Sequence, residues 1–344
     1  MRAYPSKVVV LMNKLNPQLI DKFGREVNYV RISVTDRCDF RCVYCMAEDM
    51  TFVPRKDVLS LEELYSIAQA FTELGVGKLR FTGGEPLIRT DVMSLFKKVG
   101  TLPGLKELVL TSNGSQLKKY AVPLREAGVR RINISLDSLN PERFKSLTRI
   151  GKLDTVLHGI AAAKSAGFER IKINAVILKG RNEDEVIDLV NYIRDQQLDI
   201  SFIEEMPLGL IDEHNRKLSF CSSDEIQKRI DAVYPLTPTT ENTGGPSRYY
   251  QMAGSDSRIG FISPHSHNFC HLCNRVRVTA EGRLLLCLGN EHSVDLRAVL
   301  RQEGCTLEDV KATIVAAMAI KPERHYFDLS NDPQILRFMN ATGG

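Results

Sequence analysis

From about residue 29 onward, short apolar runs alternate with longer segments in which apolar residues recur every three or four positions. Short apolar runs are typical of buried strands, and the longer period is typical of helices that pack on a sheet. The clearest helix covers 61–74, because Ser60 and Glu63 can form a capping box and Gly75 stands where a helix commonly ends. The pattern predicts strands over 30–34, 78–81, 107–111, 130–135, 171–177 and 199–204, and helices over 61–74, 91–99, 116–127, 153–166 and 183–196.

Six strands that alternate with helices in this way imply a parallel sheet with right-handed crossovers. A closed barrel of the TIM type needs eight such units, and the chain supplies six before its pattern changes. We therefore predict an α/β fold, an open and partial parallel (β/α)6 barrel. Polar and glycine-rich residues cluster where the strands end, and ligands bind at that rim in parallel barrels.

The pattern changes after about residue 235. The stretch 237–257 is rich in Pro, Gly, Thr and Ser and is predicted to be a loop. A tight turn at Glu281 and Gly282 indicates a hairpin. The region is predicted to contain strands over 259–262, 275–279 and 283–287, and helices over 293–302 and 306–319. We divide the chain into an N-terminal segment (1–28), the partial barrel (29–235) and a C-terminal α+β region (236–344).

The composition is that of a soluble globular protein, with 43% hydrophobic and 26% charged residues in a chain of 344. The formal net charge of +4 is too small to indicate a general nucleic-acid surface. The chain has no run of 18 apolar residues, and the apolar run 8–12 is too short for a signal peptide. We therefore predict a cytoplasmic protein that binds neither nucleic acid nor a membrane. In that compartment, eight cysteines indicate metal ligands rather than disulfides.

The first candidate metal site is formed by Cys38, Cys42 and Cys45, which are spaced C-x3-C-x2-C. Three thiolates can hold three corners of a cubane iron–sulfur cluster and leave one iron open to a small molecule, which suits catalysis better than electron storage. A zinc knuckle or a ferredoxin-like site is the alternative. Both need a fourth nearby ligand, and no Cys or His lies between Met46 and His158.

The second candidate metal site is formed by Cys270, Cys273 and Cys287, in the pattern C-x2-C-x13-C. The predicted hairpin can fold the third cysteine back beside the first two. Spacing alone leaves zinc open here, because C-x2-C is a common zinc element. The fourth zinc ligand would then be His265, His267 or His271. The remaining cysteines, Cys221 and Cys305, belong to no motif and are assigned no role.

Several basic residues stand in or beside predicted strands, where a charge is costly unless it is paired. Arg275 and Arg277 are two apart on one strand, so both point to the same face. Arg31, Arg80 and Lys172 stand at or inside other strands. Each could lie on a solvated face. Together at one rim they would bind a highly anionic ligand, and guanidinium groups suit phosphates.

These motifs resemble those of a known family. The first cysteine motif with Tyr44, and the run Gly83, Gly84, Glu85, Pro86, resemble the radical S-adenosylmethionine (SAM) enzymes. The finer resemblance is to the MoaA family, the GTP 3′,8-cyclases of molybdenum-cofactor biosynthesis. It runs from about residue 19 to the C-terminus and includes 29–38, 202–207 and 269–277. His271 departs from the family pattern but leaves the cysteine spacing intact.

The resemblance implies a role for each candidate residue. Each set of three cysteines, here called a tripod, would hold a 4Fe–4S cluster. The resemblance therefore replaces zinc at the second tripod with an auxiliary cluster that meets the substrate. SAM would bind the first cluster and contact Tyr44, Gly84, Ser135 and Met206. GTP would contact Arg31, Arg80, Thr111, Lys172, Arg275 and Arg277. The residues implied in catalysis are Arg275, Arg277, Gly343 and Gly344.

The terminal glycines are open to two interpretations. Most chain ends are frayed, but a tail without side chains can also thread a narrow pocket. The resemblance favours the second interpretation.

The implied reaction begins with a 5′-deoxyadenosyl radical that takes hydrogen from the ribose C3′ of GTP. C3′ then attacks C8 of the guanine and gives (8S)-3′,8-cyclo-7,8-dihydroguanosine 5′-triphosphate. The resemblance also implies an electron donor such as flavodoxin or ferredoxin and transfer of the product to the next enzyme, MoaC. Monomer and homodimer both stay open. The alternatives are a peptide-modifying radical SAM enzyme, which usually carries more C-terminal cysteines, and an electron carrier, which needs no open cluster site.

Overall fold

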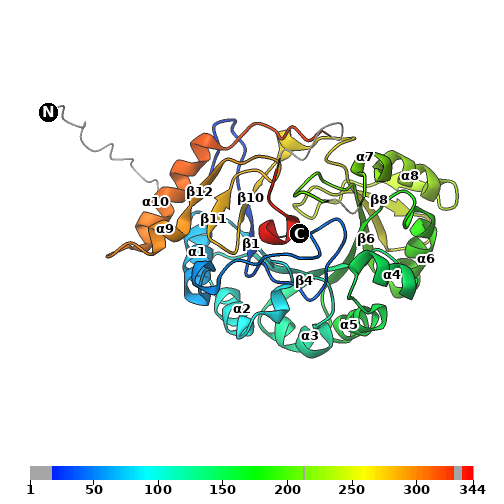
Figure 1. The fold of residues 1–344 in the computed structure, drawn as a ribbon, viewed down its shortest axis with the longest axis horizontal. Helices are drawn as coiled ribbons and strands as arrows, with labels where there is room; N and C mark the ends of the chain where they lie inside the picture. The colour runs from blue at the N-terminus through cyan, green and yellow to red at the C-terminus, as the bar shows by residue number, and fades with distance from the viewer. Residues whose placement is uncertain (1–17, 212–213, 329–334, 344) are drawn as a thin grey trace.

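The computed structural model describes residues 18–211, 214–328 and 335–343, and one twelve-stranded sheet runs through them (Figure 1). Its order is β12-β11-β10-β1-β2-β3-β4-β5-β6-β9-β8-β7. The strands are β1 (Tyr29–Ser33), β2 (Lys78–Thr82), β3 (Glu107–Ser112), β4 (Val129–Ser135), β5 (Arg170–Val176), β6 (Asp199–Ile203), β7 (Leu236–Pro238), β8 (Arg248–Met252), β9 (Arg258–Ile262), β10 (Arg275–Val278), β11 (Arg283–Leu285) and β12 (Ser293–Asp295).

Helices cover the outer side of the curved sheet, and Figure 1 shows α1 to α6 along its convex face. The helices are α1 (Leu61–Glu73), α2 (Val92–Gly100), α3 (Leu117–Glu126), α4 (Pro141–Thr148), α5 (Leu153–Ser165), α6 (Val186–Gln196), α7 (Arg216–Ser219), α8 (Ser223–Asp231), α9 (Leu296–Leu300), α10 (Leu307–Ala317) and α11 (Met339–Thr342). The capping box of Ser60 and Glu63 is present at the start of α1. None of the helices in the described ranges is long and apolar enough to cross a membrane.

The six predicted strands form the parallel core β1 to β6 in sequence order, which confirms the partial barrel. The C-terminal region extends the same sheet at both edges. Strand β10 pairs in parallel with β1, and β9 pairs in parallel with β6. No backbone pairing joins β9 to β10 within the ranges that the structure covers, so the barrel stays open.

Three details differ from the sequence prediction. The loop predicted over 237–257 contains β8, whose alternation is hard to see because polar residues flank the buried Tyr249 and Met252. The helix predicted over 293–302 begins only at Leu296, because residues 293–295 pair with β11 instead. Helices α4, α7 and α8 and the short strand β7 were also not predicted.

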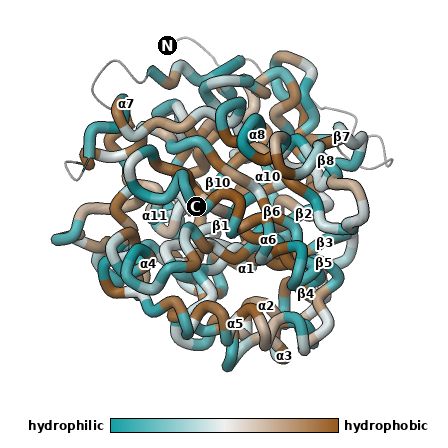
Figure 2. Tube along the Cα trace, turned by 90° about the vertical axis from the view of Figure 1, so that its right-hand side faces the viewer, coloured by the Kyte–Doolittle hydropathy of each residue, from teal (hydrophilic) through white to brown (hydrophobic). Residues whose placement is uncertain are grey.

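Packing of large apolar side chains between sheet and helices forms the core. Phe81 on β2 meets Phe96 on α2 edge to face, with ring centroids 5.0 Å apart. Phe202 on β6 stacks on Phe261 of β9 at 6.1 Å, which joins the C-terminal extension to the barrel. Figure 2 shows hydrophobic segments recurring along the strands and the helices that cover them. Such burial is the main favourable term in folding, and it fixes the strand ends that carry the site.

Candidate active site

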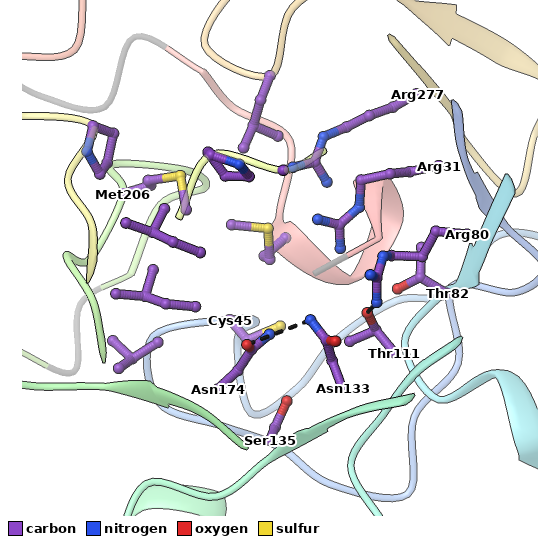
Figure 3. Close-up of a pocket in the computed structure, with 18 of the residues that line it drawn as sticks. Arg31, Cys45, Arg80, Thr82, Thr111, Asn133, Ser135, Asn174, Met206 and Arg277 are labelled. Carbon is purple, nitrogen blue, oxygen red and sulfur yellow. Dashed lines mark hydrogen bonds between the residues drawn. The ribbon is translucent and has the colours of Figure 1, made fainter. Parts of the chain in front are cut away.

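A cavity of about 260 Å³ lies inside the barrel, at the carboxyl ends of the strands. Figure 3 shows Arg31, Arg80 and Arg277 on one wall and Met206 on the opposite wall. The cavity is lined by nearly all the residues singled out from the sequence: Arg31, Cys38, Cys42, Tyr44, Cys45, Arg80, Gly84, Thr111, Ser135, Lys172, Met206, Cys270, Cys273, Arg275, Arg277 and Cys287. Gly343 reaches the site through Arg277. Gly344 lies outside the described residues.

The first cysteine loop follows β1 directly and is held by backbone contacts. Gly84 donates a hydrogen bond to the carbonyl oxygen of Thr35 at 2.8 Å, and Glu85 donates one to that of Arg37, also at 2.8 Å. A Cβ atom on Gly84 would lie 2.2 Å from the Arg37 carbonyl oxygen. The approach of the two segments therefore requires glycine at this position.

The cysteines of this loop are partly buried and lie near acidic groups. Burial raises the pKa of Cys45 to about 12, and Asp137 adds to the effect. Burial and Glu85 also raise the pKa of Cys38. Free thiols in such a place hold their protons, so only ligation to a metal would make thiolates favourable here. The Cys38 sulfur accepts hydrogen bonds from Phe40 N–H at 3.3 Å and from the Asn113 amide at 3.6 Å.

The second tripod converges as the hairpin predicts. Cys270 and Cys273 precede β10, and Cys287 follows β11, which pairs antiparallel with β10. The proposed zinc histidines contact none of these thiols in the described part of the chain. Instead, His265 contacts the Glu205 carbonyl oxygen, His267 contacts Asp224, and His271 is exposed.

Two residues that sequence reasoning missed contact the second tripod. His325 Nδ1 lies 3.0 Å from Cys270 Sγ, and Lys321 Nζ lies 3.5 Å from Cys273 Sγ. Both follow helix α10, far along the chain from the cysteines, and no local motif marks them.

The arginines are neighbours across paired strands. Arg31 on β1 stands opposite Arg80 on β2 and Arg277 on β10. Burial, together with the charges of Arg80 and Arg275, lowers the pKa of Arg31 to about 10, although Tyr29 acts in the opposite direction. Burial also lowers the pKa of Arg277 well below its ordinary value. Packed like charges of this kind favour a polyanionic ligand.

Tyr29 lies among these cations. Its hydroxyl accepts a hydrogen bond from Arg80 Nε at 2.5 Å. Burial alone would raise the pKa of Tyr29, but the charges of Arg80, Arg31 and Lys78 outweigh it and lower the pKa to about 7. Sequence reasoning missed Tyr29 and Lys78, although both stand on the same strands as predicted arginines.

The candidate SAM residues line the same cavity, and Tyr44 belongs to the first cysteine loop itself. The Tyr44 hydroxyl donates to the Asp137 carboxylate at 2.6 Å, and the carboxylate also accepts from Val176 N–H at 2.8 Å. Burial raises the pKa of Asp137 to about 6. Asn133 and Asn174, 3.5 Å apart, line the cavity beside Ser135 (Figure 3). Asp137 stands at a strand end, which is the signal that could have found it.

The C-terminal residues lie inside the barrel (Figure 1). Met339 donates from its backbone N–H to the carbonyl oxygen of Cys45 at 3.2 Å, and the Asn340 amide donates to that of Asp36 at 2.8 Å. Arg277 donates to the carbonyl oxygen of Gly343. This tail therefore contacts both the first cysteine loop and the arginine wall, which is the side of the cavity formed by Arg31, Arg80 and Arg277. A frayed end would make no such contacts.

The chain matches two protein families, the Radical SAM superfamily over residues 32–193 and Molybdenum Cofactor Synthesis C over residues 198–327. A GTP 3′,8-cyclase of Saccharophagus degradans is 61% identical over 329 residues, which is 96% of this chain and 99% of that protein. Another, of Pseudomonas entomophila, is 60% identical over 331 residues, with 96% and 99% covered.

Among solved structures, Streptococcus suis SuiB bound to S-adenosylmethionine matches with a TM-score of 0.58 at 15% identity, covering 91% of this chain and 79% of that one. This likeness concerns the fold alone, and it agrees with the open barrel.

Proposed function

Because the chain belongs to the GTP 3′,8-cyclase family of the radical SAM superfamily, we propose that it converts GTP into (8S)-3′,8-cyclo-7,8-dihydroguanosine 5′-triphosphate, the first step of molybdenum-cofactor biosynthesis. One observation carries the proposal. Two cysteine tripods and a wall of guanidinium groups line the same cavity. Identity of 61% over nearly the whole chain favours this activity over a peptide-modifying one.

Membership of the radical SAM superfamily gives the chain S-adenosylmethionine and an iron–sulfur cluster as cofactors. Cys38, Cys42 and Cys45 would hold that cluster, beside the four candidate SAM contacts Tyr44, Gly84, Ser135 and Met206. When bound, this pair supplies the reductive cleavage that gives a 5′-deoxyadenosyl radical.

We extend the proposal to a second 4Fe–4S cluster on Cys270, Cys273 and Cys287. Similarity to GTP 3′,8-cyclases over nearly the whole chain supports a cluster there, and the three cysteines lie within the match to Molybdenum Cofactor Synthesis C.

The arginine wall would hold the triphosphate. Arg31, Arg80 and Arg277 are adjacent across β2, β1 and β10, so their charges are fixed before the ligand arrives. Arg275, Lys172 and Thr111 line the same cavity and would complete the grip. A fixed triphosphate places the ribose C3′ and the guanine C8 in one pose, and such positioning can lower a barrier by several kcal/mol, roughly 7–11 at best.

The test uses anaerobically reconstituted protein with dithionite, SAM and GTP. We expect about eight irons per chain, formation of 5′-deoxyadenosine and conversion of GTP to the cyclised product. Cleavage of SAM without any change in GTP would overturn the cyclase activity. About four irons plus one zinc would show that the second tripod is a zinc site.

The family suggests further partners, which belong to the proposal. An electron donor such as flavodoxin or ferredoxin would reduce the first cluster, and MoaC would receive the product in the cytoplasm. Size-exclusion chromatography with light scattering decides between monomer and homodimer.

A further inference from the structure

Lys321 is a buried lysine whose hydrogen-bonding partners include a cluster cysteine. Its side chain is among the largest fully buried ones, and the residue is 1% exposed. Its Nζ donates to Cys273 Sγ at 3.5 Å and to the Leu286 carbonyl oxygen at 3.2 Å. In the described part of the chain, the hydrogen bonds of its ammonium go to a sulfur and a carbonyl oxygen and not to a carboxylate. A buried ammonium without a counter-charge is costly, so an anionic partner is expected at this point.

The thiolates of the second tripod are the anions within reach. Lys321 Nζ donates to Cys273 Sγ at 3.5 Å, and its other hydrogen bond goes to the carbonyl oxygen of Leu286, the residue directly before Cys287. A three-thiolate 4Fe–4S cluster carries net negative charge and becomes one unit more negative when it takes up an electron. The ammonium of Lys321 therefore attracts the reduced cluster more strongly than the oxidised one.

His325 lies beside another cysteine of the same tripod, Cys270. Its Nε2 faces the Pro264 carbonyl oxygen at 3.0 Å, and its Nδ1 faces Cys270 Sγ at 3.0 Å. A Cβ on Gly289 would lie 2.7 Å from the His325 Cβ, so a glycine there lets the ring approach. The imidazole is thereby fixed beside the sulfur rather than free to turn toward solvent.

Arg25 fixes the segment that carries both residues. Its guanidinium donates to the Cys270 carbonyl oxygen at 2.8 Å, and to those of Pro322 and Glu323 at 2.7 and 2.6 Å. One side chain thus ties the second cysteine loop to the residues directly after Lys321. Arg25 therefore holds the backbone directly after Lys321 beside the second cysteine loop.

The two tripods have opposite electrostatic surroundings. The carboxylates of Glu85 and Asp137 lie near the first tripod and oppose ionisation of its thiols. At the second tripod the neighbouring charge is a cation, the ammonium of Lys321, which lies 3.5 Å from Cys273 Sγ. The potential of an iron–sulfur cluster follows the charge and hydrogen bonding around it.

We propose that Lys321 is the buried counter-charge of the second cluster, and that its ammonium raises the reduction potential of that cluster. Lys321 is a positioning residue, since it acts through a cysteine sulfur. The inference rests on the proposed function only in requiring that the second tripod holds a 4Fe–4S cluster.

The test isolates the second cluster. The first tripod is removed by changing Cys38, Cys42 and Cys45 to alanine, and the full chain is reconstituted anaerobically. A mediated redox titration followed by electron paramagnetic resonance then gives the one-electron potential of the second cluster, with dithionite as reductant. The substitutions at position 321 are Lys321→Met, Lys321→Gln and Lys321→Arg.

We expect Lys321→Met and Lys321→Gln to reduce the equilibrium constant for reduction at least tenfold, a fall of about 59 mV for one electron. Lys321→Arg keeps the charge and should stay near the unmodified value. The control is Lys311→Met, which removes a lysine paired with Glu73 and Glu308 on the surface of α10.

The following results would overturn the inference about Lys321. An unchanged potential in both neutral variants would overturn the inference while leaving the second cluster in place. A normal potential in Lys321→Gln alone would mean that a hydrogen bond, not charge, is responsible, and would also overturn it. If Lys321→Met fails to load iron, the glutamine and arginine variants decide. No cluster at all in the triple-alanine protein would overturn the second-cluster assignment itself.

Discussion

The guanidinium of Arg277 donates a hydrogen bond to the carbonyl oxygen of Gly343, a residue 66 positions later in the chain. Arg277 lies on β10, directly beside Arg31 of β1. The contact therefore joins the C-terminal tail to the wall that would hold the triphosphate of GTP. Gly343 adopts a φ of 77°, and a Cβ there would lie 2.2 Å from Thr82 Cγ2. Crowding and backbone conformation both require glycine at this point.

Deletion of Gly343 and Gly344 should leave iron content and SAM binding near normal but strongly reduce conversion of GTP to the cyclised product. Gly343→Ala should weaken product formation in the same direction, because its methyl group meets Thr82. The matched control is Gly304→Ala, a glycine with a φ of 72° and no atom near its missing Cβ. Iron content, deoxyadenosine and product are measured anaerobically. Wild-type product formation by the truncated chain would return the tail to a frayed end.

Removing one cysteine ligand from either tripod should show that the two clusters have different tasks. Cys42→Ala should abolish SAM cleavage, because two thiolates cannot hold the first cluster with its open site. Cys273→Ala should spare some uncoupled cleavage and lose the GTP product. Cys305→Ala, a cysteine outside both tripods, is the control. Deoxyadenosine and product are quantified by chromatography. The division of tasks is wrong if both tripod variants lose only the product.

Arg275→Ala and Arg277→Ala should weaken GTP handling far more than SAM binding. Hydrogen bonds to charged groups contribute about 1.5–3 kcal/mol each, which corresponds to roughly 10- to 100-fold in affinity or turnover. Arg283→Ala is the control, since this arginine of the neighbouring strand β11 pairs with Asp295 at 3.6 Å. Binding is measured separately for each ligand. Equal loss of both ligands would mean that the two arginines only support the fold.

Tyr29→Phe should remove a pH-dependent contribution to stability. An unfolded tyrosine has a pKa of about 10, and in the fold the pKa of Tyr29 is lowered to about 7 because the charges of Arg80, Arg31 and Lys78 outweigh burial. The ionised phenol therefore stabilises the fold fully above pH 10 or so, and this contribution is lost as pH falls through about 7.

The melting temperatures of wild type and Tyr29→Phe should thus diverge as pH rises from about 7 to about 9. Burial raises the pKa of Tyr192, so Tyr192→Phe should show no such pH dependence in this range. A constant difference between wild type and Tyr29→Phe would show that Tyr29 stays protonated among its cations.

The sequence by itself determined the parallel core and the spacing of the two cysteine tripods. The alternation of strands and helices is local information. Buried positions recur every two residues in a strand and about every 3.6 residues in a helix. The cysteine spacings and the run from Gly83 to Pro86 are equally local. They indicate the two tripods and the ligand-binding rim at the carboxyl ends of the strands without any knowledge of tertiary contacts.

Only the tertiary structure decided which strands complete the sheet and which side chains surround the sites. Strands β9 and β10 follow different loops yet flank β6 and β1, a choice made by packing such as that of Phe202 on Phe261. Lys321, His325 and Tyr29 carry no motif. Their environments depend on residues distant in sequence, since the charge and burial that a side chain meets are set by the three-dimensional neighbours and not by spacing along the chain.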